Sequence, residues 1–143
     1  MFYKRKYKPI YPQKYTGDHT NIIMRSSWET KFAIWCDKNP SILKWSSEET
    51  VVPYVSPVDN KAHRYFIDFK IQVKSNTGSV KTYLIEIKPA SQAILERVGK
   101  NKYNQAQFVK NQAKWAAAQI WCKQQGIKFR IVSENDLFHN GKA

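Results

Sequence analysis

Tyr83-Leu84-Ile85-Glu86-Ile87-Lys88-Pro89 is the most informative stretch of the sequence for the fold. Successive side chains of a β-strand point to opposite faces, so Ile85 and Ile87 share one face while Glu86 and Lys88 share the other. Charges in such an apolar strand must be paired or bound, because an isolated buried charge is costly. One interpretation is a hydrated sheet face that carries a cross-strand ion pair. The other interpretation is a functional site.

The preceding segment, Arg64 to Val73, alternates apolar and polar residues and predicts a half-buried strand. A turn signal follows at residues 75–78 (Ser-Asn-Thr-Gly), and residues 80–88 then return as the partner strand. A hairpin of this kind brings Asp68 to the same side of the sheet as Glu86. The alternative for Asp68 is a solvated polar face that it shares with Lys70 and Gln72.

Two carboxylates and an ammonium group would meet near the end of these strands. Hard oxygen ligands suit Mg²⁺, which takes one or two carboxylates and keeps several waters. Such an ion polarises a phosphate and lowers the pKa of a bound water. Lys88 would add positive charge at the water or at the developing phosphorane. On this interpretation the strands carry a hydrolytic site for phosphodiesters.

The remaining elements complete a mixed α/β pattern. Ser26 followed by Glu29 forms a capping box, and it predicts a helix that ends near Asp37. Residues 51–55 predict a short edge strand, residues 104–125 a long helix that ends at Gly126, and residues 128–133 a last strand. The order helix, three strands, helix, strand predicts an α/β domain around a central mixed sheet.

The chain has 143 residues and a formal net charge of +13, from 24 Lys and Arg against 11 Asp and Glu. This charge suggests a polyanionic partner but does not separate a nuclease from a passive DNA clamp. Cys36 and Cys122 are the only cysteines, which excludes a disulfide scaffold and a Cys-rich zinc site. No apolar run is long enough to cross a bilayer, so we expect no membrane partner.

We expect two parts in the chain. Residues 1–15 contain five Lys or Arg, no acid, and tyrosines at every fourth position, and Pro9 and Pro12 argue against a helix. They predict an extended basic arm whose tyrosines either stack on bases or dock on the domain. Residues 16–143 are expected to form a single nuclease domain.

Asp68, then Glu86-x-Lys88 on the next strand, with Glu29 on the preceding helix, resembles the PD-(D/E)xK nuclease superfamily, whose core is that of the restriction endonucleases. The proline that usually precedes the aspartate is Ile67 here. The resemblance implies divalent-metal chemistry, with Mg²⁺ or Mn²⁺ bound by Asp68, Glu86 and the Ile87 carbonyl, and it implies that Glu29 adds a carboxylate. Glu29 also suits the capping box, and the two roles compete for one side chain.

A longer series of motifs is similar to the head-completion nucleases of T-even-like tailed phages, and more distantly to TnsA-type transposon endonucleases. The motifs are Tyr15-Thr-Gly-Asp-His-Thr20, Arg25-Ser-Ser-Trp-Glu29, Trp35-Cys-Asp37, Pro53-Tyr-Val-Ser-Pro-Val-Asp-Asn60, Arg64-Tyr-Phe66, Leu84-Ile-Glu-Ile-Lys-Pro89 and Lys110-Asn-Gln-Ala-Lys-Trp115. This resemblance implies a small nuclease that acts when DNA-filled heads are joined to tails. The implied partners are DNA and head, portal or tail-connector proteins, in the host cytoplasm during assembly and in the virion.

The residues expected to hold DNA are basic or polar and lie outside the carboxylate cluster. On the long helix they share one arc, which is either a solvated basic face or a phosphate-binding surface. With one arginine before the first helix and the N-terminal arm, the set is Lys4, Arg5, Lys6, Arg25, Lys110, Asn111 and Lys114.

Two functions from different classes remain. The first is a Mg²⁺-dependent deoxyribonuclease with little sequence specificity, in which Asp68, Glu86, Lys88 and Glu29 act. The second is a structural virion protein that binds DNA or portal proteins and carries an idle nuclease fold. The first is favoured because an idle site has no physical need to keep opposed charges on one sheet face.

Overall fold

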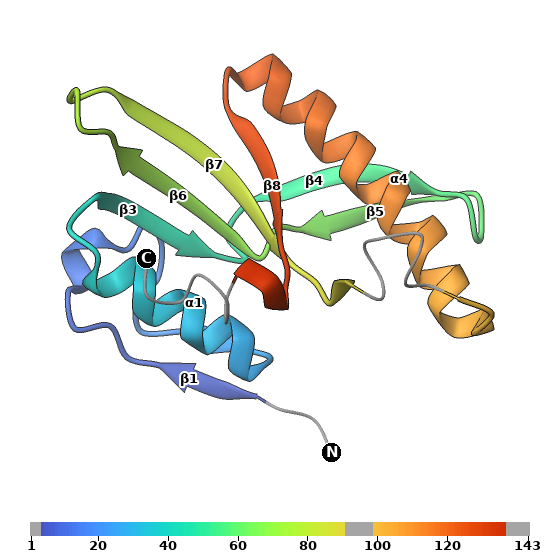
Figure 1. Ribbon diagram of the computed structural model, residues 1–143, viewed down its shortest axis with the longest axis horizontal. Helices are drawn as coiled ribbons and strands as arrows, with labels where there is room; N and C mark the ends of the chain where they lie inside the picture. Colours follow the sequence, from blue (N-terminus) through green and yellow to red (C-terminus); the bar gives the residue numbers. More distant parts are fainter. Residues whose placement is uncertain (1–3, 91–98, 137–143) are drawn as a thin grey trace.

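The computed structural model describes residues 4–90 and 99–136 (Figure 1). In chain order, the elements are β1 (Arg5–Tyr7), the 3-10 helix η1 (Pro12–Lys14), β2 (Ile22–Met24), α1 (Ser27–Lys38), β3 (Ile42–Ser47), β4 (Val51–Ser56), β5 (Lys61–Phe66), β6 (Phe69–Lys74), β7 (Val80–Ile87), α4 (Lys102–Gln125) and β8 (Lys128–Val132). The predicted mixed α/β fold with a central mixed sheet is confirmed.

The central sheet has the strand order β3-β6-β7-β8. β6 pairs antiparallel with both β3 and β7, whereas β8 pairs parallel with β7. The predicted hairpin between β6 and β7 is present, and its turn uses Gly78 at φ +88°, a conformation that glycine adopts without steric cost. Two smaller antiparallel pairs, β1-β2 and β4-β5, lie outside this sheet.

The single strand predicted for residues 64–73 is wrong, because two strands occupy this segment. β5 ends at Phe66 and pairs with β4, whereas β6 begins at Phe69 and joins the central sheet. Ile67 and Asp68 form the link between them. The apolar–polar alternation does not reveal this break, because Tyr65, Ile67 and Phe69 are all buried. Tyr65 and Ile67 pack into the core on one face of the sheet, whereas Phe69 packs into the core on the other. Asp68 therefore lies at a bend, just before its strand begins.

The start of α1 and the end of α4 lie where the capping residues predict. The Ser26 hydroxyl accepts a hydrogen bond from the Glu29 N–H at 3.1 Å, which caps the N-terminus of α1. The Asn101 side chain caps α4 in the same way, so α4 begins two residues before the predicted Asn104. Gly126 ends α4 with φ +72°.

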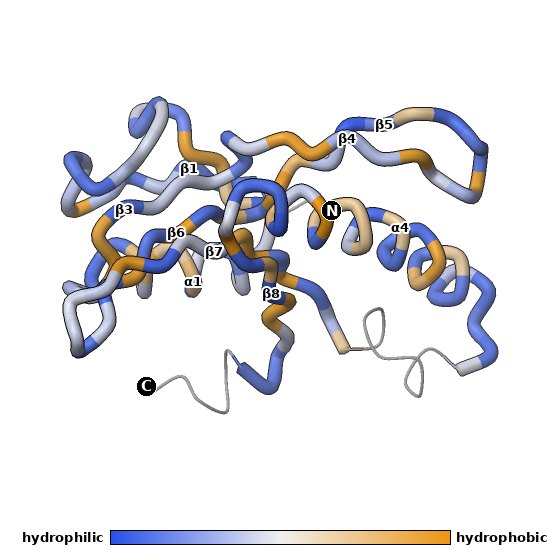
Figure 2. The backbone as a smooth tube through the Cα atoms, turned by 90° about the horizontal axis from the view of Figure 1, so that it is seen from above, coloured by the Kyte–Doolittle hydropathy of each residue, from blue (hydrophilic) through white to orange (hydrophobic). Residues whose placement is uncertain are grey.

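The central sheet is covered on both faces (Figure 1). α1 packs with Phe69, Ile85 and Ile87 on one face, and α4 packs with Leu84 and the β4-β5 pair on the other. Polar and apolar residues alternate turn by turn along α4 in Figure 2, as expected for a helix with one buried face. Each face of the sheet therefore borders its own hydrophobic core.

The N-terminal segment packs against the domain from residue 5 onward. β1 pairs with β2, and Tyr7 lies edge-on against Trp45 with the ring centroids 5.9 Å apart. Tyr15 is buried and makes a similar contact with Trp45 at 4.8 Å. Lys14 donates hydrogen bonds to three carbonyls at the end of α1. Of the two roles expected for the tyrosines, Tyr7 and Tyr15 take the docked one; residues 1–3 of the predicted arm lie outside the described residues.

Two further expectations concern membranes and cysteines. Within residues 4–90 and 99–136, none of the helices has the length and apolar character needed to span a membrane. Cys36 and Cys122 are both buried and unbridged. Burial raises the pKa of both thiols, which keeps them protonated and unreactive at neutral pH.

Candidate active site

Asp68, Glu86 and Lys88 meet where β6 begins and β7 ends. The last paired residues of these strands are Phe69 and Ile85, so Asp68 and Glu86 are the next pair along the same register. Lys88 follows β7 directly, and its N–H donates to the Val132 carbonyl at the end of β8. The structure therefore brings together the three side chains that the sequence singled out.

Asp68 is a half-buried carboxylate in a negative environment. Its Oδ2 accepts a hydrogen bond of 2.8 Å from the Ile87 N–H, which fixes the carboxylate against the end of β7. Burial raises the pKa of Asp68 well above its usual value, and the negative charges of Glu86 and Glu29 raise it further. The Ile87 hydrogen bond and the Lys88 charge lower this pKa but do not offset the rise. A cation beside Asp68 would relieve this repulsion.

Glu86 is buried, with 3% of its surface exposed, and both of its oxygens have neighbours. The Tyr65 hydroxyl donates a 2.7 Å hydrogen bond to Oε1, and the Lys88 ammonium lies 3.8 Å from Oε2. A hydrated sheet face is thereby excluded, because the carboxylate is buried and not in solvent. Burial raises the pKa of Tyr65, and the Glu86 charge adds to this rise, so the phenol stays protonated and continues to donate.

Glu29 reaches the cluster from α1 while it also serves the helix cap. Its Oε1 accepts a 3.0 Å hydrogen bond from the Arg25 N–H, and its own N–H donates to Ser26. Burial raises the pKa of Glu29, and nearby negative charge on Glu48 and Glu86 acts in the same direction. Glu29 thus lies close enough to Glu86 for the two charges to interact. Its role as a metal ligand stays a prediction.

Arg25 lies beside Glu48, a carboxylate that the sequence reasoning missed. The Arg25 Nε lies 3.0 Å from a Glu48 carboxylate oxygen, in an ion pair that is largely exposed. The Glu48 N–H donates to the Ile67 and Asp68 carbonyls at the β5–β6 bend. Arg25 therefore borders the carboxylate cluster, and its predicted contact with DNA stays a prediction.

The predicted DNA-binding residues of α4 differ in exposure. Lys110 and Lys114 are half-buried, whereas Asn111 is fully buried. A direct DNA contact by Asn111 does not fit this burial, because its amide lies inside the core with Trp115, Ala118 and Cys122 on the buried face of α4. Neither its amide nitrogen nor its amide oxygen has a hydrogen-bond partner among the described residues.

The N-terminal basic residues Lys4, Arg5 and Lys6 are exposed, as a contact with DNA requires. β1 fixes two of them, Arg5 and Lys6, on the domain instead of leaving them on a free arm.

Tyr65 is a further residue that the sequence reasoning missed. The apolar–polar alternation of residues 64–73 placed Tyr65 correctly in the core, but nothing in a single sequence indicated that its hydroxyl reaches Glu86.

The donor set fits a hard divalent cation. Asp68 and Glu86 supply carboxylate oxygens, and the Ile87 carbonyl belongs to the same strand end. Within residues 4–90 and 99–136, no group of three or more His, Cys, Asp or Glu side chains is arranged to hold a metal ion. A set of two carboxylates nevertheless suits Mg²⁺, which retains several waters. Burial raises the pKa of Asp68, and the negative charges of Glu86 and Glu29 raise it further, which a bound cation would counter. Residues of the site thus fit the metal that the sequence predicts.

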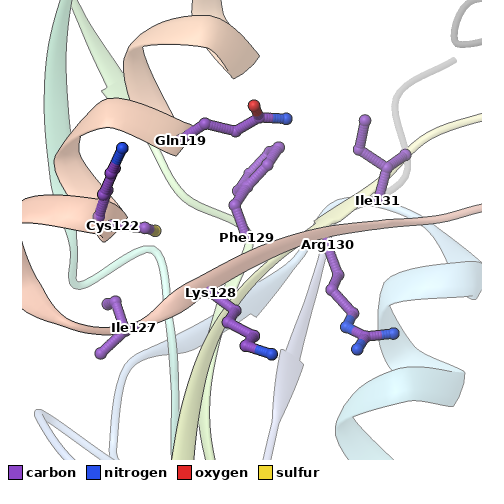
Figure 3. Close-up of a pocket in the computed structure, with 8 residues that line it drawn as sticks. Gln119, Cys122, Ile127, Lys128, Phe129, Arg130 and Ile131 are labelled. Atoms are coloured by element: carbon purple, nitrogen blue, oxygen red, sulfur yellow. The ribbon is translucent and has the colours of Figure 1, made fainter.

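An open groove of about 610 Å³ lies elsewhere, between the second half of α4 and β8 (Figure 3). In Figure 3, Phe129 and Ile131 point to one side of β8, whereas Lys128 and Arg130 point to the other. None of the predicted catalytic residues lines this groove. This groove is therefore separate from the carboxylate cluster, which lies at the strand ends.

An aspartate at the start of one strand and Glu-x-Lys at the end of its hairpin partner, in a mixed sheet covered by two helices, define a nuclease of the PD-(D/E)xK class. Residues 39–134 match the family described as "TnsA-like endonuclease N terminal", a segment that includes Asp68, Glu86 and Lys88. The chain is also 38% identical over 146 residues to the "Head completion nuclease" of Enterobacteria phage T4, with 96% of this chain and 95% of the phage T4 protein covered.

The chain therefore belongs to the family of TnsA-like endonucleases, and it is a relative of the phage T4 head completion nuclease. The resemblance inferred from the sequence motifs is confirmed, as are the fold class and the identification as a nuclease. Glu29 lies outside the matched segment of residues 39–134.

Proposed function

We propose that this protein is a Mg²⁺- or Mn²⁺-dependent deoxyribonuclease that hydrolyses phosphodiester bonds during phage head completion and head–tail joining. The observation that carries the proposal is the convergence of Asp68, Glu86 and Lys88 at one strand end, where Asp68 is buried beside the negative charges of Glu86 and Glu29. Membership of the endonuclease family supports the reaction class, and the name of the phage T4 relative supports the biological step.

Asp68, Glu86 and the Ile87 carbonyl would hold the metal ion, and Glu29 would add a carboxylate from α1. When bound, the ion offsets negative charge on the scissile phosphate and lowers the pKa of a coordinated water. Tyr65 holds Oε1 of Glu86, so Oε2 remains available on the side where Lys88 lies. The Ile87 N–H fixes the orientation of Asp68 in the same way.

The reaction is the addition of water to a phosphodiester. The water oxygen forms a bond to phosphorus, one P–O ester bond breaks, and the departing alkoxide receives a proton, so that a phosphomonoester and an alcohol result. Lys88 would orient the attacking water and stabilise the negative charge of the transition state. An ammonium placed at developing charge in a partly buried site is an efficient form of electrostatic catalysis.

DNA would be held mainly by its backbone, which predicts little sequence specificity. Arg25, Lys110 and Lys114 would contact phosphates near the cluster, and Lys4, Arg5 and Lys6 would extend the contact surface. Contacts to phosphates position a protein on DNA without reading its sequence. Each phosphate neutralised adds about −0.9 to the slope of log affinity against log salt concentration.

Head, portal or tail-connector proteins are the proposed protein partners. The proposed location is the host cytoplasm during assembly and then the virion. A nuclease that works at this step would need to reach DNA at the opening of a filled head. The name of the phage T4 relative supports this assignment.

Incubation of the purified protein with supercoiled plasmid tests the proposal. We expect Mg²⁺ or Mn²⁺ to produce nicked and linear DNA, and excess EDTA to stop cleavage while DNA binding persists at low salt. Stable binding without metal-stimulated cleavage would refute the enzymatic proposal. That result would support the structural alternative, an idle nuclease fold that binds DNA or portal proteins.

A further inference from the structure

Lys114 is a half-buried cation held between aromatic rings. Its Nζ lies 5.3 Å from the ring centroid of Tyr65 and 6.0 Å from that of Tyr54, within the range of a cation–π interaction. Within residues 4–90 and 99–136, its ammonium has no hydrogen bond and no ion pair. Its three N–H donors therefore depend on water for acceptors, and a ligand that displaces this water must supply acceptors in its place.

The rings that hold Lys114 also connect it to the carboxylate cluster. Tyr65 faces Lys114 with its ring and binds Glu86 with its hydroxyl, so Lys114 lies one side chain away from Glu86. Burial lowers the pKa of Lys114, and the positive charge of Lys88 lowers it further. Two ammonium groups from different elements, α4 and the end of β7, thus approach the same carboxylates.

The two lysines differ in their partners. Lys88 lies 3.8 Å from Oε2 of Glu86, so part of its charge is already offset by a carboxylate. Lys114 has no carboxylate within ion-pair distance among the described residues; the rings of Tyr54 and Tyr65 lie beside its ammonium, and the charges of Glu86 and Asp68 act on it from farther away. A phosphate group next to the cluster would offer its non-bridging oxygens to both ammonium groups and would relieve their mutual repulsion.

We propose that Lys114 is a second cationic catalytic residue, whose ammonium donates hydrogen bonds to a non-bridging oxygen of the scissile phosphate and stabilises its charge in the transition state. Tyr54 and Tyr65 determine where the ammonium lies. This inference rests on the proposed nuclease function and assigns Lys114 to the reacting phosphate itself, whereas a general DNA contact on α4 would bind a phosphate away from the reaction.

The two roles predict different kinetics. A contact made to any phosphate strengthens binding of substrate and transition state equally, so its loss weakens affinity and leaves the saturated rate unchanged. A contact that strengthens in the transition state lowers the saturated rate when it is lost. Single-turnover cleavage of a short DNA duplex, measured at saturating protein with Mg²⁺, separates the rate from the affinity.

The experiment compares Lys114→Gln and Lys114→Arg with the unchanged protein. Lys123→Gln serves as the matched control, because it removes an exposed lysine from the same helix, far from the cluster. We expect Lys114→Gln to lower the saturated rate by about 100-fold, the loss typical for one transition-state donor. Lys114→Arg should recover part of this rate because it keeps the charge, and Lys123→Gln should match the unchanged protein.

Binding and folding are measured on the same variants. DNA affinity by fluorescence anisotropy in EDTA should change far less than the rate, and circular dichroism should show a folded protein. A Lys114→Gln variant that loses affinity but keeps the saturated rate would overturn the inference, and so would one that changes neither. Failure of the unchanged protein to cleave would instead refute the proposed function, and with it this role.

Discussion

Asp37 fixes the N-terminal segment onto α1, and its removal is predicted to destabilise the whole domain. The side chain is fully buried (0% exposed) and accepts three hydrogen bonds. They come from the Tyr7 hydroxyl at 2.6 Å, the Ile10 N–H at 2.7 Å and the Tyr11 N–H at 3.0 Å. Replacement by alanine leaves these three donors without their acceptor.

The magnitude follows from the number of donors. A hydrogen bond to a charged group contributes about 1.5–3 kcal/mol. Three such bonds set an upper range, which is reduced because residues 7–11 can relax toward water, so we expect Asp37→Ala to lower the free energy of unfolding by about 4 kcal/mol. That is a large part of the stability of a typical domain, about 5–15 kcal/mol. For a chain of this length, Tm should fall by about 10–15 °C.

Urea and thermal unfolding followed by circular dichroism measure this change. Tyr7→Phe removes one of the three donors and should cost about 1.5 kcal/mol. Asp18→Asn is the control, because Asp18 is exposed and, among the described residues, its side chain accepts hydrogen bonds from Thr20 alone; this variant should unfold like the unchanged protein. An Asp37→Ala variant as stable as this control would show that residues 4–15 are not fixed on α1, and it would restore a free arm.

Three further predictions concern the site. The pKa of Asp68 is raised in the folded state, so the stabilising contribution of the protonated Asp68 carboxyl is present near pH 4 and is lost as the pH rises through the folded-state pKa. Asp68→Asn should therefore raise Tm in EDTA at pH 7 by about 3 °C or more, but should not raise Tm at pH 4. An equal Tm at pH 7 would contradict the electrostatic argument. Ser26→Ala should lower the free energy of unfolding by about 1 kcal/mol and keep the cleavage rate. Glu29→Gln should keep the hydrogen bond from the Arg25 N–H and lower the cleavage rate by about 10-fold or more. An unchanged cleavage rate in Glu29→Gln would leave Glu29 only its capping role. Tyr65→Phe should cost about 2 kcal/mol and raise the Mg²⁺ concentration needed for half-maximal cleavage; an unchanged metal requirement would show that the hydroxyl does not position Glu86.

Local signals in the sequence predicted the elements whose ends carry capping or turn residues. Ser26 and Gly126 fixed the start of α1 and the end of α4, and Gly78 fixed the β6–β7 hairpin. Once that hairpin was expected, the proximity of Asp68 to Glu86 followed from strand register alone. The central part of the site was therefore predictable without tertiary contacts.

The errors arose where tertiary contacts override local pattern. Alternation continues unbroken from Tyr65 to Phe69, although the chain changes sheet at Asp68 and the buried residues move from one core to the other. β1, β2 and β3 were missed because β1 and β2 have only three residues each and all three pair with segments far along the chain. Asn111 looked like part of a basic face, yet it lies in the buried stripe of α4 with Trp115.

Metal-stimulated plasmid nicking by the Asp68→Ala and Lys88→Ala variants tests the central claim most directly. Each variant removes one charged group from the cluster and none of the basic residues assigned to the DNA backbone. We predict that each loses about 100-fold or more of the Mg²⁺-dependent nicking rate, while salt-sensitive DNA binding in EDTA stays close to that of the unchanged protein. Undiminished nicking by both variants would contradict the assignment of the active site.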